Sequence, residues 1–521
     1  MVSENHKNGM YAVLVHNSET MKIKKILIAN RGEIAIRIMK TARKMKILTV
    51  AIRTAAEPDA MYLSFADEIF DNTEDNSDIP IFLDIEKLIS IASQAGADAL
   101  HPGYGFLAEN PYFAQKCVDN KIIFIGPSPD AIYKMGNKTI ARKLAMQNGL
   151  PLAMGSEGNI ADEEEALTIA EKIGYPVIIK AASGGGGRGM RIVRDEAEMV
   201  KMFSIASREA EKAFKDPSVF IEKYIENPKH IEFQILGDTK GNIIHLGERE
   251  CSIQRKHQKL LEEAPSGALD PALRKKMGNM AVRIAKAVGY YSAGTVEFLL
   301  DSEKNFYFME MNTRIQVEHP VTEIVTGIDL IEQQIRIANG EVLKFRQEDI
   351  KITGWAIECR INAEDVQSGF APDPGRIEKI SMPDYPYVRV DTGVREGSSI
   401  VANYDSMIAK LIISGKDRKE AITRCKMALD KVWIKGAKTT LPFFRLLVRN
   451  QDFQDGKFTT AFIEKDLEKY YYNSEYEEML AAWLATKLFI EENLQTNSIN
   501  VDMKEGKGMS PWLLNKRINQ F

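Results

Sequence analysis

The sequence predicts a protein of α/β and α+β type, with an N-terminal doubly wound parallel-sheet domain, a central α+β domain with a mobile glycine-rich loop, and a C-terminal mixed α+β domain. Strand-like and helix-like segments alternate over residues 22–135, which is the pattern of a parallel sheet. Strand-like pairs joined by tight turns dominate after residue 176, which indicates antiparallel pairing. The length of 521 residues corresponds to three domains at roughly 150 residues each.

The N-terminal domain is expected over residues 22–135, after a disordered extension at residues 1–21. Its predicted strands are KKILIAN, KILTVAIRT, ADALHPGYG and IIFIGP. Its predicted helices are RGEIAIRIMKTARKM, PIFLDIEKLISIASQAG and ENPYFAQKCVDNK. Ile34, Ile38 and Ala42 recur at helical spacing in the first helix, so one face of that helix is apolar.

The central domain is expected over residues 136–352. A helix opens at Asp162, where Glu165 stands three residues on in a capping arrangement. Two strands, YPVIIKAA and MRIVRD, flank the loop SGGGGRGM, and a long helix follows over residues 196–214.

The C-terminal domain is expected over residues 353–466. Its predicted strands lie around ECRIN, GRIEKI, YVRVDTG and MIAKLIIS, and helices follow them. The tail over residues 467–521 carries an apolar helical stripe, which suggests packing on the chain's own body or docking on a partner. The stripe consists of Leu480, Trp483, Leu484 and Leu488.

Composition excludes several classes of protein. Lys and Arg number 69 and Asp and Glu 73, for a net charge of −4. Proteins that bind nucleic acid usually carry a basic excess on one face, so we expect no nucleic acid partner. No run reaches the ~18 apolar residues of a membrane span, so we expect no membrane partner. The 4 cysteines include no Cys-x-x-Cys pair, so we expect neither a disulfide framework nor a zinc site, and a cytoplasmic location.

The glycine run at residues 184–187 is the first candidate for chemistry. With Gly189 it fits G-x-G-x-x-G, but a dinucleotide fingerprint must open a helix and here a strand-like segment follows. Backbone amides in such a hairpin tip can close over phosphates, although a plain surface turn fits the loop equally well. Lys180 ends the strand that enters the loop, and Lys138 begins an earlier helix. Either lysine alone fits a solvated surface position.

Two carboxylates form the second candidate. Glu297 and Glu310 lie on two strands joined by a tight turn, so antiparallel pairing can place both carboxylates on one face. Like charges at that distance repel unless something neutralises them. With Asn312 nearby, the oxygen-only ligand set suits Mg²⁺.

Three polar clusters follow. In NTRIQVEHPVTE, Arg314 offers a planar fork that can bind a small carboxylate or bicarbonate, and Glu318 can act as a base. His319 in the same segment is expected to be structural. In CSIQRKHQK, polar side chains crowd a short segment that would ordinarily be a solvated loop. In ECRINAED, Arg360 follows a buried-looking strand, and we expect it to face the central domain across a cleft or to pair with Glu364 or Asp365.

Together these strings resemble the biotin carboxylase family of the ATP-grasp superfamily. The strings that carry the resemblance are IANRGEIAIRI, HPGYGFLAEN, YPVIIKAASGGGGRGM, ERECSIQRKHQK, FMEMNTRIQVEHPVTE, ECRINAED and YDSMIAKL. The resemblance covers residues 22–466 and implies that the central domain is an ATP-grasp domain with a mobile glycine-rich lid at about 153–225. It also implies that MgATP activates bicarbonate as carboxyphosphate and that biotin on a carrier protein is then carboxylated.

The resemblance assigns roles to individual residues. It implies Mg²⁺, or Mn²⁺ in its place, at Glu297, Glu310 and Asn312, a bicarbonate and biotin site at Arg314, Gln316, the Val317 backbone and Arg360, the base Glu318, and the positive neighbour Lys259. Arg360 would stabilise the biotin enolate. ATP would contact Lys138, Lys180, the loop Gly184, Gly185, Gly186, Gly187 and Gly189, the adenine-site residues Glu222, Lys223 and Ile225, and His230, Gln254 and His257.

The implied partners are a biotin carboxyl carrier protein, carboxyltransferase subunits and a second copy of this chain in a homodimer. No Ala-Met-Lys-Met biotinylation string occurs, so we expect the carrier on a separate polypeptide. The acceptor stays open between acetyl-CoA, as in the acetyl-CoA carboxylase of fatty acid biosynthesis, propionyl-CoA and pyruvate. Two alternatives are another ATP-grasp ligase, such as a carbamoyl-phosphate-synthetase-like or purine-pathway enzyme, and a non-catalytic scaffold subunit of a carboxylase complex.

Overall fold

The computed structural model describes residues 22–74, 77, 79–156, 158–160, 162–182, 190–401, 404–466 and 482–490. The chain divides into two units, Met1–Lys465 and Asp466–Phe521. The N-terminal extension and the glycine loop lie outside the described residues, so the expectations for them stay predictions. In the part of the chain that is described, no helix combines the length and apolar character that crossing a bilayer would require.

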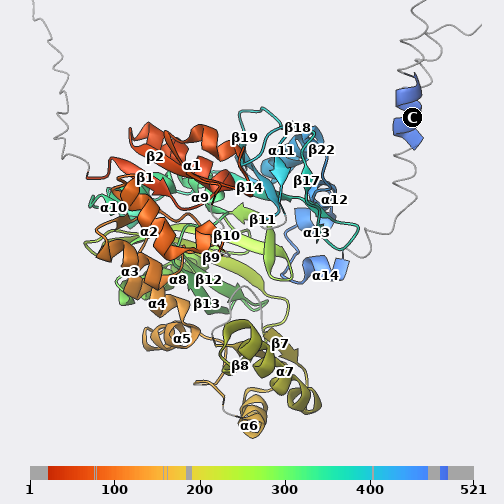
Figure 1. Ribbon diagram of the computed structural model, residues 1–521. Coiled ribbons are helices and arrows are strands. Elements are labelled where there is room, and N and C mark those ends of the chain that lie inside the picture. Colours follow the sequence, from red (N-terminus) through yellow and green to blue (C-terminus); the bar gives the residue numbers. More distant parts are fainter. Residues whose placement is uncertain are drawn as a thin grey trace, which may run out of the picture. The chain divides into compact units, whose positions relative to one another are not determined.

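The first sheet is parallel, as the sequence predicts, and its strands run in the order β3-β2-β1-β4-β5. Figure 1 labels β1 and β2 of this sheet. The strands are β1 (Lys25–Ile28), β2 (Leu48–Thr54), β3 (Glu68–Asn72), β4 (Ala99–His101) and β5 (Ile123–Phe124). The sequence analysis did not predict β3, because this edge strand is largely exposed and so has no apolar run.

Helices cover both faces of this sheet, which makes it doubly wound. Ile26 and Ile28 of β1 pack into one apolar cluster with α1 (Gly32–Lys44) and α10 (Leu330–Ala338). Leu27 points the other way, into a second cluster with α2 (Ile85–Gln94) and α3 (Pro111–Asp119). The alternation of side chains along β1 therefore builds both cores. Two further helices, α4 (Pro129–Gly136) and α5 (Lys138–Gln147), lead away from the sheet.

A small antiparallel sheet with two helices follows, at the lower end of Figure 1. Its strands lie in the order β7-β6-β8, and its elements are α6 (Glu163–Ile173), β6 (Val177–Ala181), β7 (Met190–Val193), α7 (Glu196–Phe214) and β8 (Val219–Lys223). Asp162 caps α6 by accepting a hydrogen bond from the Glu165 amide, and Asp195 caps α7 in the same way. β6 and β7 pair directly across the glycine loop, as the hairpin prediction requires.

The largest sheet has eight antiparallel strands in the order β13-β12-β9-β10-β11-β14-β21-β19. Its strands are β9 (Lys229–Gly237), β10 (Ile243–Arg255), β11 (Gln258–Ala264), β12 (Ser292–Leu300), β13 (Phe306–Asn312), β14 (Trp355–Asn362), β19 (Val388–Thr392) and β21 (Met407–Gly415). Helices α8 (Pro271–Ala287), α9 (His319–Thr326) and α11 (Arg418–Lys431) pack against it.

Smaller elements complete the first unit. They are three two-stranded ladders, β15 (Glu364–Asp365) with β16 (Ala371–Pro372), β17 (Gly375–Arg376) with β20 (Ser399–Ile400), and β18 (Lys379–Ser381) with β22 (Trp433–Lys435), and the helices α12 (Leu441–Leu447), α13 (Gln451–Gln454) and α14 (Phe462–Asp466).

Arg360 faces the central strands, as expected, but it does so by direct contact and not across a cleft. β14, which carries Arg360, pairs directly with β11, and Glu262 lies opposite Glu358 in this ladder. The sheet therefore runs without a break through the predicted boundary at residues 352–353. A cross-strand contact replaces the expected cleft because β11 and β14 are hydrogen-bonded neighbours.

In the second unit, the described part is a helix at residues 482–490, where Trp483, Leu484 and Leu488 are exposed. Leu480 of the predicted stripe lies outside the described residues.

Candidate functional site

The predicted metal ligands Glu297 and Glu310 stand directly opposite each other in the β12–β13 ladder. The sequence prediction of their pairing is therefore confirmed. In the described part of the chain, Glu310 accepts no hydrogen bond, whereas Glu297 accepts several. Burial and the neighbouring Glu297 carboxylate raise the pKa of Glu310. An oxygen-lined pair of this kind is under like-charge repulsion that a cation would relieve.

Glu297 is held by four side chains from three segments of the chain. Asn312 Nδ2 donates to Glu297 Oε1 at 2.7 Å, and Gln316 Nε2 donates to the same oxygen at 3.0 Å. His230 Nε2 lies 2.7 Å from Glu297 Oε2. Burial lowers the pKa of His230, but Glu297 outweighs it and the pKa is raised overall.

Lys259 is the fourth partner and the centre of the cluster. Its Nζ lies 2.5 Å from Glu232 Oε2, 3.0 Å from Glu297 Oε1 and 2.7 Å from Glu318 Oε1. Burial opposes the charge on Lys259, yet these three carboxylates hold its pKa well above the ordinary value. Lys259 therefore stays positively charged, and its ion pairs connect the predicted metal ligand Glu297 to Glu318.

Glu318 is the fully buried residue that precedes α9 and is clamped between two cations. Lys259 contacts Oε1, and Arg360 donates from NH2 to Oε2 at 2.7 Å. Burial raises the pKa of Glu318, but Lys259, Arg360 and Arg249 outweigh it and hold the pKa well below the ordinary value. Glu318 is therefore an ionised proton acceptor at neutral pH.

Arg314 presents its fork beside this cluster. Its Nε donates to Glu109 Oε2 at 2.8 Å, its NH2 to Asn312 Oδ1 and its NH1 to Gln316 Oε1, both at 3.2 Å. Glu109 Oε1 also accepts from the Thr313 amide, so one carboxylate fixes both the backbone and the side chain of this segment. Such a fork suits a small planar anion.

The backbone of Val317 lies in the same turn. Its carbonyl accepts a hydrogen bond from Lys410 Nζ at 2.9 Å. His319, expected to be structural, is fully buried, with Nδ1 2.8 Å from the Gln316 carbonyl.

The residues predicted to bind ATP lie on α5 and on the small sheet. Lys138 on α5 is near the predicted metal ligand Glu310. Lys138 opens α5, and burial, partly offset by Glu310, lowers its pKa. Lys180 on β6 pairs with Glu222 on β8, which also holds Arg142. The Glu222 carboxylate is thus occupied by two ion pairs. Its neighbour Lys223 donates hydrogen bonds to the carbonyls of Gly174 and Tyr175.

The remaining residues predicted to contact ATP lie on or beside β8, β10 and β11. Ile225 is half-buried just after β8, Gln254 is buried near the end of β10, and His257 lies in the turn between β10 and β11. The loop Gly184–Gly189 is not among the described residues, so its predicted contacts stay predictions.

Arg360 forms no ion pair with Glu364 or Asp365, the pairing that the sequence offered as the alternative to a role in the site. Its NH2 lies 2.5 Å from Glu262 Oε1 and 2.7 Å from Glu318 Oε2. The expectation of a local pair is wrong because Arg360 points from β14 toward the β11 and α9 side of the site.

Sequence reasoning missed several buried charges. Arg249 is fully buried and donates to Gln234 and Thr322 besides its ion pair with Glu232. The buried Glu262 and Lys410 were also missed, as was the exposed Glu109 in the turn before α3. The signal of the buried ones is a charged residue inside an otherwise apolar strand, as in LLEEA or MIAKLII, which is costly unless the charge is paired.

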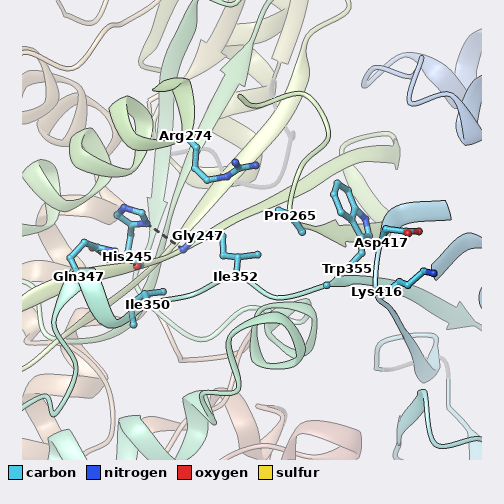
Figure 2. A pocket seen from close by; sticks show the side chains of 11 residues that line it. His245, Gly247, Pro265, Arg274, Gln347, Ile350, Ile352, Trp355, Lys416 and Asp417 are labelled. Atoms are coloured by element: carbon cyan, nitrogen blue, oxygen red, sulfur yellow. Dashed lines mark hydrogen bonds between the residues drawn. The ribbon is translucent and has the colours of Figure 1, made fainter. Parts of the chain in front are cut away.

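A separate recess of about 460 Å³ lies elsewhere in the described chain, and Figure 2 shows its lining. His245, Arg274, Ile352, Trp355 and Lys416 are among its walls, and none of the predicted site residues is. Arg274 is engaged by Glu248 at 2.7 Å. The candidate site is therefore the buried charge cluster and not this recess.

Three family models match the chain. They describe a biotin carboxylase N-terminal domain at residues 22–132, a carbamoyl-phosphate synthase L chain ATP-binding domain at 137–346, and a biotin carboxylase C-terminal domain at 358–465. The middle model alone would leave other ATP-grasp ligases open, whereas the two flanking models describe biotin carboxylase domains.

Individual relatives agree with these models. Biotin carboxylase 1 of Bacillus subtilis is 53% identical over 443 residues, which cover 85% of this chain and 98% of that protein. The biotin carboxylase of a Nostoc species is 52% identical over 445 residues, or 85% of this chain and 99% of that protein. A crystal structure of the biotin carboxylase domain dimer of Hydrogenobacter thermophilus 2-oxoglutarate carboxylase, in complex with MgADP, ADP and bicarbonate, matches with a TM-score of 0.83 and 49% identity, covering 86% of this chain and 98% of that chain.

Proposed function

Because the chain belongs to the biotin carboxylase family, we propose that its buried charge cluster uses ATP and bicarbonate to carboxylate biotin on a separate carrier protein. The observation that carries the proposal is the position of Glu318, an ionised carboxylate clamped between Lys259 and Arg360 next to the Arg314 fork. An anion fork, a proton acceptor and a metal-type carboxylate pair are the parts that bicarbonate activation needs. A scaffold subunit would have no use for this arrangement.

Glu297, Glu310 and Asn312 would hold Mg²⁺, or Mn²⁺ in its place. Their fit rests on the facing carboxylates and on the Glu310 side chain, which accepts no hydrogen bond within the described residues. Oxygen donors of this kind suit a hard divalent cation. When bound, the metal supplies positive charge next to the ATP phosphates.

Bicarbonate would lie at Arg314, Gln316 and the Val317 backbone. Glu109 holds Arg314 in place, which limits the loss of side-chain freedom on binding. Glu318 would accept the bicarbonate proton at a carboxylate oxygen while the bicarbonate oxygen attacks the γ-phosphorus of ATP. The products are carboxyphosphate and ADP.

ATP would contact Lys138 and Lys180 through its phosphates. Closure of the loop Gly184–Gly189 over those phosphates is part of the proposal, as are the adenine-site roles of Glu222, Lys223 and Ile225. His230, Gln254 and His257 would lie near the ribose and phosphates. The position of Lys138 beside Glu310 supports this placement.

Arg360 would then act in the second step, in which carboxyphosphate splits into CO₂ and phosphate, the phosphate takes the proton of the biotin ureido nitrogen, and that nitrogen bonds to the CO₂. A deprotonated biotin ureido group carries negative charge on oxygen, and a fixed cation stabilises it. The short distance between Arg360 and Glu318 supports a site where both steps occur side by side.

The proposal extends to organisation and partners. It includes a homodimer, a biotin carboxyl carrier protein and carboxyltransferase subunits on other chains, and a cytoplasmic location. The dimer of the Hydrogenobacter thermophilus domain supports the first, and the four free cysteines support the last. Domains at residues 22–135, 136–352 and 353–466 are supported by the three matching family models.

The direct test incubates the purified chain with MgATP, labelled bicarbonate and free biotin. We expect acid-labile label on biotin and ADP release that requires bicarbonate. A chain that hydrolyses ATP equally well without bicarbonate and never labels biotin would contradict the proposal.

A further inference from the structure

One guanidinium nitrogen of Arg360 is shared between two carboxylates. Arg360 NH2 lies 2.5 Å from Glu262 Oε1 and 2.7 Å from Glu318 Oε2. The Nε of Arg360 is buried and makes no hydrogen bond within the described residues. The position of Arg360 therefore depends on these two acidic partners.

Glu262 has few other interactions. It is fully buried on β11, its carboxylate oxygens accept no hydrogen bond in the described part of the chain, and its single ion-pair partner there is Arg360. Directly across the ladder lies Glu358, also fully buried, whose carboxylate oxygens accept no hydrogen bond there. Two facing buried carboxyl groups cannot both ionise, so one of them holds a proton.

We propose that Glu262 is a positioning residue of this site, which anchors Arg360 when Glu318 loses its negative charge. The inference rests on the proposed function, in which Glu318 takes the bicarbonate proton. In that step the bicarbonate oxygen bonds to the γ-phosphorus, the bond from that phosphorus to ADP breaks, and the proton moves to Glu318. Arg360 then has one ionised partner left, and that partner is Glu262.

The electrostatics agree with this exchange. Burial raises the pKa of Glu262 to about 7, Arg360 opposes the rise, and the charge of Glu318 adds to it. Neutralising Glu318 removes a like charge, so the pKa of Glu262 falls and its anionic form is favoured at that moment. Burial raises the pKa of Glu358 well above its ordinary value, so Glu358 carries the proton of the facing pair.

The charged and titratable groups around Glu262 come from every neighbouring element. They are Arg360, Glu358 and Cys359 on β14, Lys259 on β11, Cys251 on β10, Glu318 before α9, and Lys410 on β21 beside Glu358. Both thiols have a pKa raised well above the ordinary value by burial, so they stay neutral. Glu262 is thus the group of this set whose charge changes near neutral pH.

The test compares Glu262→Gln with Glu263→Gln. Glu263 is the next residue on β11, is equally buried, and pairs with Arg418 away from the site. We expect Glu262→Gln to form roughly tenfold less carboxybiotin per ATP consumed, at the lower end of the loss from removing an outer partner of a site. Glu263→Gln should keep the wild-type ratio.

A double variant shows whether Glu262 acts through Arg360. Glu262→Gln combined with Arg360→Gln should be no worse than Arg360→Gln alone, because the positioned group is already missing. Additive losses would overturn the inference, since they would mean that Glu262 acts independently of Arg360.

The wild-type protein offers a measurement that needs no substitution. Its carboxybiotin yield per ATP should fall in acid, as the pH drops through the pKa that Glu262 has when Glu318 is neutral, which lies below the resting value of about 7. Glu262→Gln should lack this dependence, whereas a purely structural role would leave the pH profile in place. A flat wild-type profile with a normal ratio in Glu262→Gln would refute the anchor and leave the proposed function standing. Persistence of bicarbonate-dependent ATP cleavage in Glu318→Gln would instead refute the assignment of the base.

Discussion

Arg360 and Glu318 lie 42 positions apart in the chain, yet Arg360 NH2 donates to Glu318 Oε2 across 2.7 Å. The contact exists because β14 pairs with β11, which brings Arg360 next to the turn before α9. The group proposed to stabilise biotin and the proposed base for bicarbonate are therefore in direct contact. Each constrains the geometry of the other.

Arg360→Gln should separate the two half-reactions. We expect carboxybiotin formation to fall by ~10²–10³, as for loss of one oxyanion donor, while much of the bicarbonate-dependent ATP cleavage remains. The measurement is the ratio of carboxybiotin formed to ATP consumed. A wild-type ratio in the variant would refute the role in stabilising the biotin enolate.

Glu310→Gln should abolish the response to Mg²⁺. Burial and Glu297 raise the pKa of Glu310, so without metal the substitution relieves repulsion and the melting temperature should stay equal or rise. Adding MgATP should raise the melting temperature of the wild-type protein more than that of the variant. Glu303→Gln in the exposed turn before β13 is the matched control, and an equal Mg²⁺ response in all three proteins would count against the metal site.

Lys259→Met should destabilise the folded chain strongly. The substitution leaves Glu232, Glu297 and Glu318 facing one another without their shared cation. Removing one partner of a buried ion pair costs about 3–5 kcal/mol in free energy of unfolding. Thermal unfolding beside the exposed control Lys240→Met checks this, and equal melting temperatures would contradict the central position of Lys259.

Because His101 is buried, we expect the folded protein to lose stability in acid. Burial lowers the pKa of His101 to about 3, whereas the unfolded chain takes up this proton near pH 6.5. The unfolded state therefore binds more protons between these values, and stability falls as the pH drops from 6.5 toward 3. By pH 5 the loss is about 2 kcal/mol.

The variant His101→Asn tests whether His101 causes this loss of stability in acid. The His101 Nδ1 accepts a hydrogen bond from the Gly103 amide, and an Asn carbonyl can accept in its place without titrating. The difference between melting temperatures at pH 7 and pH 5 should shrink in the variant. An unchanged difference would mean that another group causes the acid sensitivity.

Much of the fold follows from local pattern. The alternating segments before residue 135 gave the parallel sheet, and the spacing of Glu297 and Glu310 gave their cross-strand pairing. Strand β3 was missed because an exposed edge strand leaves no apolar signal. The spacing of apolar residues predicts a helix or strand when one face of that element is buried. It gives no signal when both faces are exposed.

The partners of the buried charges could not be predicted in the same way. Arg360 has acidic neighbours in sequence at Glu364 and Asp365, but its ion pairs are with Glu262 and Glu318. Those pairs depend on which strands are neighbours in the sheet, and the order β11-β14 joins segments separated by some ninety residues of chain. Long-range pairing of this kind has no local sequence signal.

The replacement Glu318→Gln tests the central claim most directly. A positioned base contributes ~10²–10⁴-fold to rate, so we expect bicarbonate-dependent ATP cleavage to fall by that factor while ATP affinity stays unchanged. Glu332→Gln, a partly exposed position on α10, serves as the matched control with normal turnover. ATP cleavage is measured with and without bicarbonate in all three proteins. A large loss confined to the bicarbonate-dependent rate of Glu318→Gln is the predicted result, and near-normal bicarbonate-dependent turnover in that variant would contradict the account.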